Sequence, residues 1–412
     1  MGTPAAPGGG WVKNALLLVA SLLFGSGILE LATRILMASR PEVTTGEQSV
    51  YEKFDPILGW RNRPGAWVQY RRREYSTRVV INSLGFRDVE RSPRRVLGTA
   101  RILALGDSFV EGYTVERDET VTRRVEAVSA AAGCRAEVIN AGVHAYSTDQ
   151  EALWLQNEAE GLSPDLVLVF AYYNDILNNI RGNYWGASKP VTTVMEGKLV
   201  VTNLPLPGAS MDAAAGHVQV QAPRPLDGSA FVSFVNGRTL VGAPRLHRFL
   251  SRFGLWAPVE PDEIPEELRA YKSRGDLPEF DQAWRHTRAM LGALGRMIRA
   301  RGGTPVLVHV PARFEVSERD WELTILRYGI DPEVWDRALV RKRLEGIASQ
   351  EGWAFLDLTK ALKSAAGVLS GEPYFRYDGH WNRLGHDLAA RAVVDFLRQR
   401  ALLPCGGRTD PS

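Results

Sequence analysis

The nonapeptide RILALGDSF, residues 101–109, carries the clearest structural signal in this chain of 412 residues. Its first part, Arg101–Leu105, is mainly apolar and predicts a short buried strand. Gly106 permits a tight turn directly after the strand, and Ser108 can then lie near the N-terminus of the following helix. A serine at the carboxyl edge of a sheet has the exposure that a nucleophile needs. The alternative is an ordinary turn in which Ser108 only caps the helix.

Strand and helix patterns alternate on both sides of this stretch. We expect strands at Arg101–Leu105, Ala136–Asn140, Asp165–Phe170, Pro305–His309 and Trp353–Leu358. We expect helices at Thr120–Ala132, Thr148–Glu160, Phe280–Arg301, Val334–Glu351 and Arg383–Arg400. Such alternation predicts an α/β fold, a three-layer doubly wound parallel sheet with right-handed crossovers. Ligands bind at the carboxyl ends of the strands in such sheets.

An apolar segment lies near the N-terminus. The stretch Ala15–Leu29 carries no charge, and Lys13 precedes it. Apolar helical character continues to Met37, interrupted by Glu30 and Arg34. Because the uncharged stretch is shorter than the roughly 20 residues of a full span, a signal-peptide core is one interpretation. We favour an uncleaved signal anchor, since no small-x-small cleavage site follows; a buried amphipathic helix is the third interpretation.

These patterns divide the chain into segments. Residues 1–40 are the predicted signal anchor or transmembrane helix, which makes the protein a single-pass cell-membrane protein with its catalytic domain periplasmic or extracellular. Basic residues on both sides of the helix do not decide its orientation. Residues 41–100 form a lead-in packed on the catalytic domain, residues 101–404 the catalytic domain, and residues 405–412 a tail. An insertion at about 178–277 is expected to hold two hairpin-like runs and a basic helix, at Val191–Val201, Phe231–Thr239 and Arg245–Phe253.

Composition excludes several classes of protein. The net charge of +3 is too small to predict a nucleic-acid partner. Cys134 and Cys405 do not make a disulfide framework and lack metal-ligand spacing, so their redox state stays open. We predict no metal and no cofactor.

A serine nucleophile needs a base to take its proton, and the chain has 7 histidines. The best candidate lies in the run Asp378-Gly379-His380-Trp381-Asn382, just before the last expected helix. In extended backbone, positions 378 and 380 face the same side, so Asp378 can orient the imidazole of His380. The competing bases are His144, His309 and His386.

Four short blocks resemble those of the SGNH/GDSL hydrolases, and they follow the expected elements in the family's order. Gly106–Phe109 resembles the first block, and Asn140–Gly142 resembles the second. Asn174, after the third strand, resembles the third block, and Asp378 with His380 resembles the last. The lead-in resembles that of bacterial membrane-anchored members. The resemblance implies a flavodoxin-like SGNH hydrolase fold over about residues 100–180 and 300–400.

The resemblance also implies roles for individual residues. Ser108 would be the nucleophile, His380 the base and Asp378 its partner. The oxyanion hole would be formed by the N–H groups of Ser108 and Gly142 and the side-chain amide of Asn174.

Two departures from the family pattern bear on the substrate. Tyr172 occupies a position where the family usually has glycine, which narrows the site. The last block reads Asp-x-His-Trp, as in proteins of polysaccharide O-acetylation. We therefore predict a serine esterase or deacetylase acting on an O-acylated carbohydrate or a small ester through an acyl-enzyme, with the membrane as its other partner and protein partners unknown. The alternatives are an O-acyltransferase onto a cell-envelope polysaccharide, a lipid or thioester hydrolase, and a non-catalytic carbohydrate-binding or assembly protein.

Several residues are candidates for binding the substrate. They are Tyr172, Tyr173 and His144. Together with Tyr184 and Trp185, the two tyrosines form either a sugar-stacking platform or ordinary packing at the strand ends.

Overall fold

The computed structural model describes residues 10–38, 47–92, 96–159, 161–208, 249, 263–275, 277–363 and 371–403. Five parallel strands form its central sheet, in the order β13-β12-β7-β5-β6. Their bounds are β5 Ala100–Gly106, β6 Ala136–Gly142, β7 Leu166–Ala171, β12 Thr304–His309 and β13 Ala354–Asp357. With the strands numbered along the chain this is the 2-1-3-4-5 order of flavodoxin-like sheets. The predicted fold class is confirmed, and each predicted strand is present.

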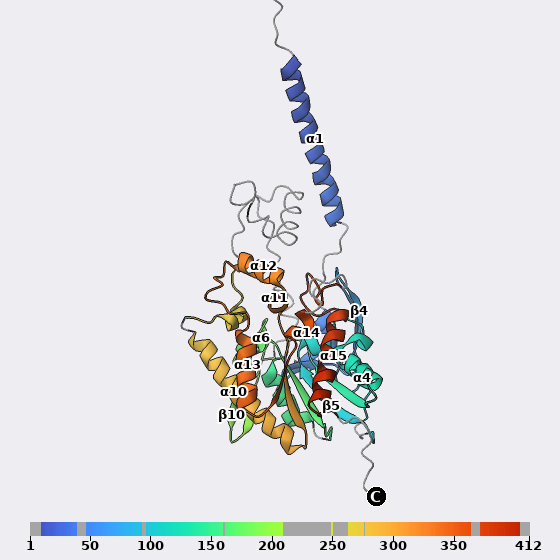
Figure 1. Ribbon diagram of the computed structural model, residues 1–412, viewed down its shortest axis with the longest axis vertical. Coiled ribbons are helices and arrows are strands. Elements are labelled where there is room, and N and C mark those ends of the chain that lie inside the picture. The colour runs from blue at the N-terminus through green and yellow to red at the C-terminus, as the bar shows by residue number, and fades with distance from the viewer. Residues whose placement is uncertain are drawn as a thin grey trace, which may run out of the picture. The chain divides into compact units, whose positions relative to one another are not determined.

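Alternate residues of the strands build two apolar cores, one on each face of the sheet. Leu103 and Val169 belong to one core, whereas Ile102 and Leu168 belong to the other. The first core is covered by α5 Thr148–Glu158, α10 Pro278–Ala300 and α13 Leu339–Gln350, and the second by α4 Val121–Ala131 and α15 Arg383–Gln399 (Figure 1). Because both faces are covered, the strands are apolar throughout, as in other parallel sheets.

Helix termini follow from local capping. Ser147 and Gln150 form a capping box at the start of α5, and the side chain of Asn382 accepts the N–H groups of Leu384 and Gly385 at the start of α15. The expected helix at Val334–Glu351 begins only at Leu339. The sequence analysis did not predict the short helices before and after it, which are α11 Arg313–Val316, α12 Glu318–Tyr328 and α14 Thr359–Lys363.

The lead-in consists of a short helix and two antiparallel hairpins. Their elements are α2 Glu47–Tyr51, β1 Glu52–Asp55, β2 Gly59–Asn62, β3 Trp67–Arg71 and β4 Ser76–Val80. Tyr51, Tyr70 and Tyr75 form a small core with Tyr113, which follows the turn that carries Ser108. The lead-in also reaches the loop after β6, because the indole of Trp60 donates to the carbonyl of His144 at 2.9 Å. Lead-in residues therefore lie next to the carboxyl edge of the sheet.

The described part of the insertion contains two small hairpins and a 3₁₀ helix. Their bounds are β8 Asn183–Tyr184, β9 Ala187–Ser188, β10 Thr192–Met195, β11 Lys198–Val201 and η3 Glu266–Tyr271. The hairpin expected at Val191–Val201 is confirmed. The expected hairpin Phe231–Thr239 lies outside the described residues, as does the expected basic helix Arg245–Phe253 apart from Phe249.

The N-terminal helix α1, Gly10–Ala38, belongs to a separate unit of the chain. Its segment Lys13–Ile35 is long and apolar enough to cross a membrane, with a mean hydropathy of 2.1. Glu30 and Arg34, two of the charged residues in this segment, form an ion pair at 2.7 Å, which reduces the cost of placing them near apolar surroundings.

Cys134, at the end of the turn after α4, is disulfide-bonded. Cys405 is the only other cysteine in the sequence and lies outside the described residues.

Candidate active site

Ser108 lies on a sharp turn between β5 and the four-residue helix α3, Ser108–Glu111. Because Ser108 is the candidate nucleophile, we call this the nucleophile turn. Asp107 caps this helix by accepting the N–H of Phe109 at 2.9 Å. The turn is pressed against the sheet at two glycines. A Cβ on Gly106 would lie 2.3 Å from Cγ2 of Val110, and a Cβ on Gly142 would lie 2.3 Å from the N atom of Glu111. Neither position can hold a larger residue without displacing α3.

Ser108, His380 and Asp378 form a continuous hydrogen-bonded chain, which we call the relay. The Oγ of Ser108 lies 2.8 Å from Nε2 of His380, and Nδ1 of His380 lies 2.6 Å from Oδ1 of Asp378. The other carboxylate oxygen of Asp378 accepts the hydroxyl of Tyr75 at 2.8 Å. The structure thus brings together three residues that are separated by up to 272 positions in sequence.

The carboxyl group of Asp378 is charged at neutral pH. Burial acts to raise its pKa, but hydrogen bonds from His380 and Tyr75 and the nearby imidazole outweigh burial and lower the pKa to about 2. The side chains of His380 and Asp378 are 22% and 18% exposed, so the relay is reachable from solvent.

The aromatic rings around His380 restrict its orientation. The ring of Phe109 lies 4.8 Å from the imidazole, centroid to centroid, and the ring of Tyr113 lies 5.2 Å from it. The hydroxyl of Tyr113 is 3.4 Å from Nδ1 of His380.

Two of the three competing histidines, His309 and His386, are buried and contact groups outside the relay. His309 is fully buried between Asp357, at 3.0 Å from Nδ1, and Glu315, at 3.5 Å from Nε2. Burial opposes its charge, but the two carboxylates prevail and raise its pKa to about 9. Nδ1 of His386 accepts the N–H of Val121 at 3.1 Å, and burial lowers the pKa of His386 to about 3, so this ring stays neutral.

His144 is the third competing histidine and lies near the relay. Its ring packs edge-on against Tyr113 at 5.6 Å, and its Nδ1 lies 3.5 Å from the buried carboxylate of Glu52. Burial acts to lower the pKa of His144, but the hydrogen bond and charge of Glu52 outweigh it and raise the pKa. His144 is therefore paired with a lead-in carboxylate.

The expected oxyanion donors differ in their availability. The N–H of Gly142 donates to Oδ1 of Asn140 at 3.0 Å, so the structure engages this amide elsewhere. The nearby Ala145 has a φ of 60°, which is costly for a residue with a Cβ, and its N–H has no acceptor among the described residues. The sequence analysis did not predict this backbone conformation in the loop after β6.

Asn174 lies at the start of α6, Tyr173–Asn178. Its Nδ2 is 3.4 Å from the hydroxyl of Tyr184, and its buried Oδ1 has no partner among the described residues. The oxygen and nitrogen of a side-chain amide are assigned from their hydrogen bonds. When Oδ1 and Nδ2 of Asn174 exchange places, the hydroxyl of Tyr184 donates to Oδ1, and the NH₂ group is free to donate to a ligand.

The candidate substrate-binding aromatics have different positions. The ring of Tyr172 packs on Phe109 at 4.7 Å and so adjoins the nucleophile turn. Tyr173 packs away from the relay, against Tyr271 at 5.4 Å. Trp185 is 61% exposed, stacks on Tyr184 at 4.6 Å and lies 6.1 Å from the ring of His144. Tyr184, which is buried, thus connects the exposed ring of Trp185 to Asn174.

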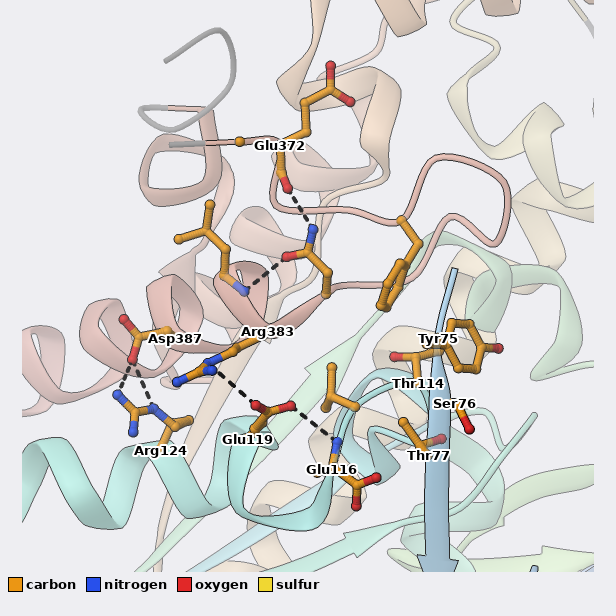
Figure 2. Close-up of a pocket in the computed structure, with 15 residues that line it drawn as sticks. Tyr75, Ser76, Thr77, Thr114, Glu116, Glu119, Arg124, Glu372, Arg383 and Asp387 are labelled. Atoms are coloured by element: carbon orange, nitrogen blue, oxygen red, sulfur yellow. Dashed lines mark hydrogen bonds and ion pairs between the residues drawn. The ribbon is translucent and has the colours of Figure 1, made fainter. Parts of the chain in front are cut away.

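A surface pocket of about 700 Å³ adjoins the relay without including Ser108 (Figure 2). It is lined by Tyr75, which donates to Asp378 of the relay, and it contains charged side chains that pair with one another. Arg124 pairs with Asp387, and Arg383 lies 3.4 Å from Glu119.

Comparisons with known proteins find similarity in part of the chain. Residues 271–409 match the family described as SGNH hydrolase-like domain, acetyltransferase AlgX. This match includes Asp378 and His380 and does not reach Ser108. None of the curated proteins matches the chain.

Solved structures similar to this chain are distant in sequence. A lipase/acylhydrolase from Enterococcus faecalis is 14% identical, with 75% of this chain and 99% of that chain covered and a TM-score of 0.36. A catalytic mutant of Axe2, an acetylxylan esterase from Geobacillus stearothermophilus, is 13% identical, with 73% and 95% covered and a TM-score of 0.36. A lipolytic protein of the G-D-S-L family from Desulfitobacterium hafniense is 12% identical, with 72% and 99% covered and a TM-score of 0.34.

Proposed function

We propose that this protein is a serine-dependent esterase that acts on an O-acylated carbohydrate through an acyl-enzyme. The observation that carries the proposal is the relay, in which Ser108, His380 and Asp378 are joined by contacts of 2.8 and 2.6 Å. Nε2 of His380 takes the proton of Ser108 as Oγ attacks the ester carbonyl, and the charge of Asp378 stabilises the resulting imidazolium. The imidazolium then gives its proton to the departing alcohol oxygen, which leaves an acyl group on Ser108.

The developing oxyanion needs preorganised donors. We assign this role to the N–H of Ser108 and the side-chain NH₂ of Asn174, whereas the N–H of Gly142 already has an acceptor in Asn140. One such donor contributes roughly 3–4 kcal/mol to lowering the barrier.

Two observations favour a carbohydrate as the alcohol part of the substrate. The matched family is described as an acetyltransferase domain, and the Asp-x-His-Trp block at Asp378 resembles proteins of polysaccharide O-acetylation. Trp185 is an exposed ring that stacks on Tyr184, the side chain next to Asn174, and an exposed ring of this kind can stack on a sugar.

Transfer to a second sugar is the alternative outcome of the same acyl-enzyme. In hydrolysis, water loses a proton to His380 and attacks the acyl carbon, the bond from that carbon to Oγ of Ser108 breaks, and Oγ takes the proton back from His380. In transfer, a sugar hydroxyl attacks in place of water. The description of the matched family favours transfer. A non-catalytic binding protein would not need a hydrogen-bonded serine, histidine and aspartate in this order.

We further propose that α1 anchors the domain to a membrane and that the domain lies outside the cytoplasm. The apolar segment Lys13–Ile35 supports the anchor. The disulfide at Cys134 supports an oxidising compartment, because disulfides rarely persist in the cytosol.

The test is the fate of the acetyl group when the full chain receives an acetyl ester and an oligosaccharide acceptor. Acetylated oligosaccharide means transfer, free acetate alone means hydrolysis, and no consumption of several acetyl esters contradicts the proposal. A Trp185→Ala variant should raise KM several-fold for an acetylated oligosaccharide and leave KM for 4-nitrophenyl acetate unchanged, because only the former offers a ring to stack on.

A further inference from the structure

The acid–base loop, residues 375–380, carries Asp378 and His380 but belongs to no regular helix or strand. Within it, the N–H of Phe375 donates to the carbonyl of His380 at 2.8 Å, and the N–H of Gly379 donates to the carbonyl of Phe375 at 3.2 Å. Gly379 has a φ of 86°, so the turn depends on a backbone conformation that other residues adopt at a cost. These contacts close the loop on itself but do not fix its distance from Ser108.

The lead-in holds this loop through a carboxylate. Glu74, in the turn between β3 and β4, accepts three successive backbone N–H groups of the loop. The distances are 2.7 Å from Arg376, 2.8 Å from Tyr377 and 3.1 Å from Asp378. Successive N–H groups that converge on one anion form a well-known anion-binding arrangement, here occupied by a side chain of the same protein.

Tyr75, the next residue, holds the catalytic carboxylate itself. Its hydroxyl donates to Oδ2 of Asp378, while Oδ1 of the same carboxylate serves His380. The ring of Tyr75 is buried against Phe375 at 5.0 Å and Tyr113 at 6.3 Å, so the hydroxyl is fixed in place.

Contacts from a third segment complete the support. Arg313, at the start of α11, donates to the carbonyl of Phe375 at 3.2 Å and to that of Arg376 at 2.5 Å. The guanidinium of Arg73 lies over the ring of Tyr377 at 4.0 Å. The N–H groups of the loop are therefore bound by Glu74 of the lead-in, and its carbonyl groups are bound by Arg313 of α11.

We propose that Glu74 and Tyr75 are positioning residues of the relay, so that the lead-in hairpin forms a working part of the active site. The inference rests on the proposed serine mechanism. Glu74 sets where the loop backbone presents Asp378, and Tyr75 sets the rotation of its carboxylate toward His380. A displacement of about 1 Å between reacting groups can cost on the order of a hundredfold in rate.

The experiment uses the full chain in detergent, with 4-nitrophenyl acetate as substrate. Glu74→Ala should lower kcat about a hundredfold and leave KM nearly unchanged, because substrate contacts are not altered. Tyr75→Phe should lower kcat about tenfold, as expected for one hydrogen bond to a charged group. Glu74→Gln retains one acceptor oxygen and should recover part of the activity.

Glu90→Ala is the matched control. Glu90 is also a lead-in glutamate that accepts two hydrogen bonds in a turn, from the N–H and hydroxyl of Ser83, and it takes no part in the relay. It should keep wild-type kcat.

A second readout does not depend on turnover. The proton between Nδ1 of His380 and Asp378 should give a downfield proton resonance in the wild type and in Glu90→Ala, and this resonance should shift or vanish in Glu74→Ala at unchanged melting temperature. Wild-type kcat and resonance in Glu74→Ala would overturn the inference, as would equal losses of kcat and melting temperature in Glu74→Ala and Glu90→Ala. If the resonance responds as expected but no variant, wild type included, cleaves esters, the proposed function fails and the positioning role stands.

Discussion

The nucleophile turn and the acid–base loop bring the two halves of the relay together by different physical means. The turn at Ser108 is built by its immediate neighbours: a buried strand before it, the Asp107 cap, and two glycines that allow α3 to touch the sheet. The loop at Asp378 and His380 is held by side chains up to 304 positions away. The first half is a property of a strand–turn–helix unit, and the second is a property of the assembled domain.

This difference has a consequence for how each half should fail. A substitution in the nucleophile turn places atoms against closely packed backbone, so it should lower the free energy of unfolding. A substitution in or around the loop leaves the sheet untouched, so its cost should register in catalysis at nearly constant stability.

The largest effect should come from Asp378→Asn. An asparagine keeps the size of the side chain but no longer fixes the tautomer of His380 or stabilises its cation, so kcat on a small acetyl ester should fall by about 10⁴-fold. The control is Asp357→Asn, which alters the aspartate paired with the fully buried His309. Similar losses of kcat in the two variants would mean that the choice of His380 as base is wrong.

Asn174→Ala should have the next largest effect. Loss of one oxyanion donor should lower kcat by about 10²–10³-fold with little change in KM, because the donor acts mainly on the transition state. Steady-state kinetics on the same ester provide the measurement. A rise in KM at constant kcat would instead make Asn174 a residue that only positions substrate.

The protonation of His309, at the end of β12, should make the free energy of unfolding depend on pH. His309 has its pKa raised to about 9, so its contribution is fully present below its ordinary value of 6.5 and is lost as the pH rises through 9. With about 1.4 kcal/mol for each pKa unit, the loss is on the order of 3 kcal/mol. The free energy of unfolding should therefore fall between these pH values in the wild type and vary less in His309→Gln; parallel curves would contradict the assignment.

Gly142→Ala tests the turn at the smallest expected effect. The added Cβ would lie 2.3 Å from the N atom of Glu111, and overpacking of this kind costs about 1–3 kcal/mol. Gly346→Ala is the control, because a Cβ at this half-buried position of α13 meets nothing within 4 Å and the helix should be slightly stabilised. Chemical denaturation of both variants distinguishes a packed turn from a loose one.

The same contrast explains what could be predicted from the sequence. The five strands were predictable because apolar runs such as Leu166–Ala171 are local signals, and the nucleophile turn was predictable because it follows such a run. The start of α13 was placed five residues too early, at Val334, because residues before Leu339 form turns whose apolar side chains imitate a helical pattern.

The supports of the loop left no comparable local signal. Glu74 and Tyr75 stand in an ordinary polar turn, and their partners lie about 300 positions further along the chain. For the same reason the contacts of Gly142 were not predicted: its N–H donates to the side chain of Asn140, and its Cα packs closely against α3. The strained backbone of Ala145 becomes visible only once the loop is folded.

The central claim is that Ser108 is a nucleophile activated by His380. Its most direct test is the intact mass of the full chain after exposure to a fluorophosphonate, followed by peptide mapping. We predict a single adduct on Ser108 that forms on the wild type, slows strongly in His380→Ala and is absent from Ser108→Ala at equal folding. No adduct on the folded wild type, or an adduct that persists in Ser108→Ala, would contradict the claim.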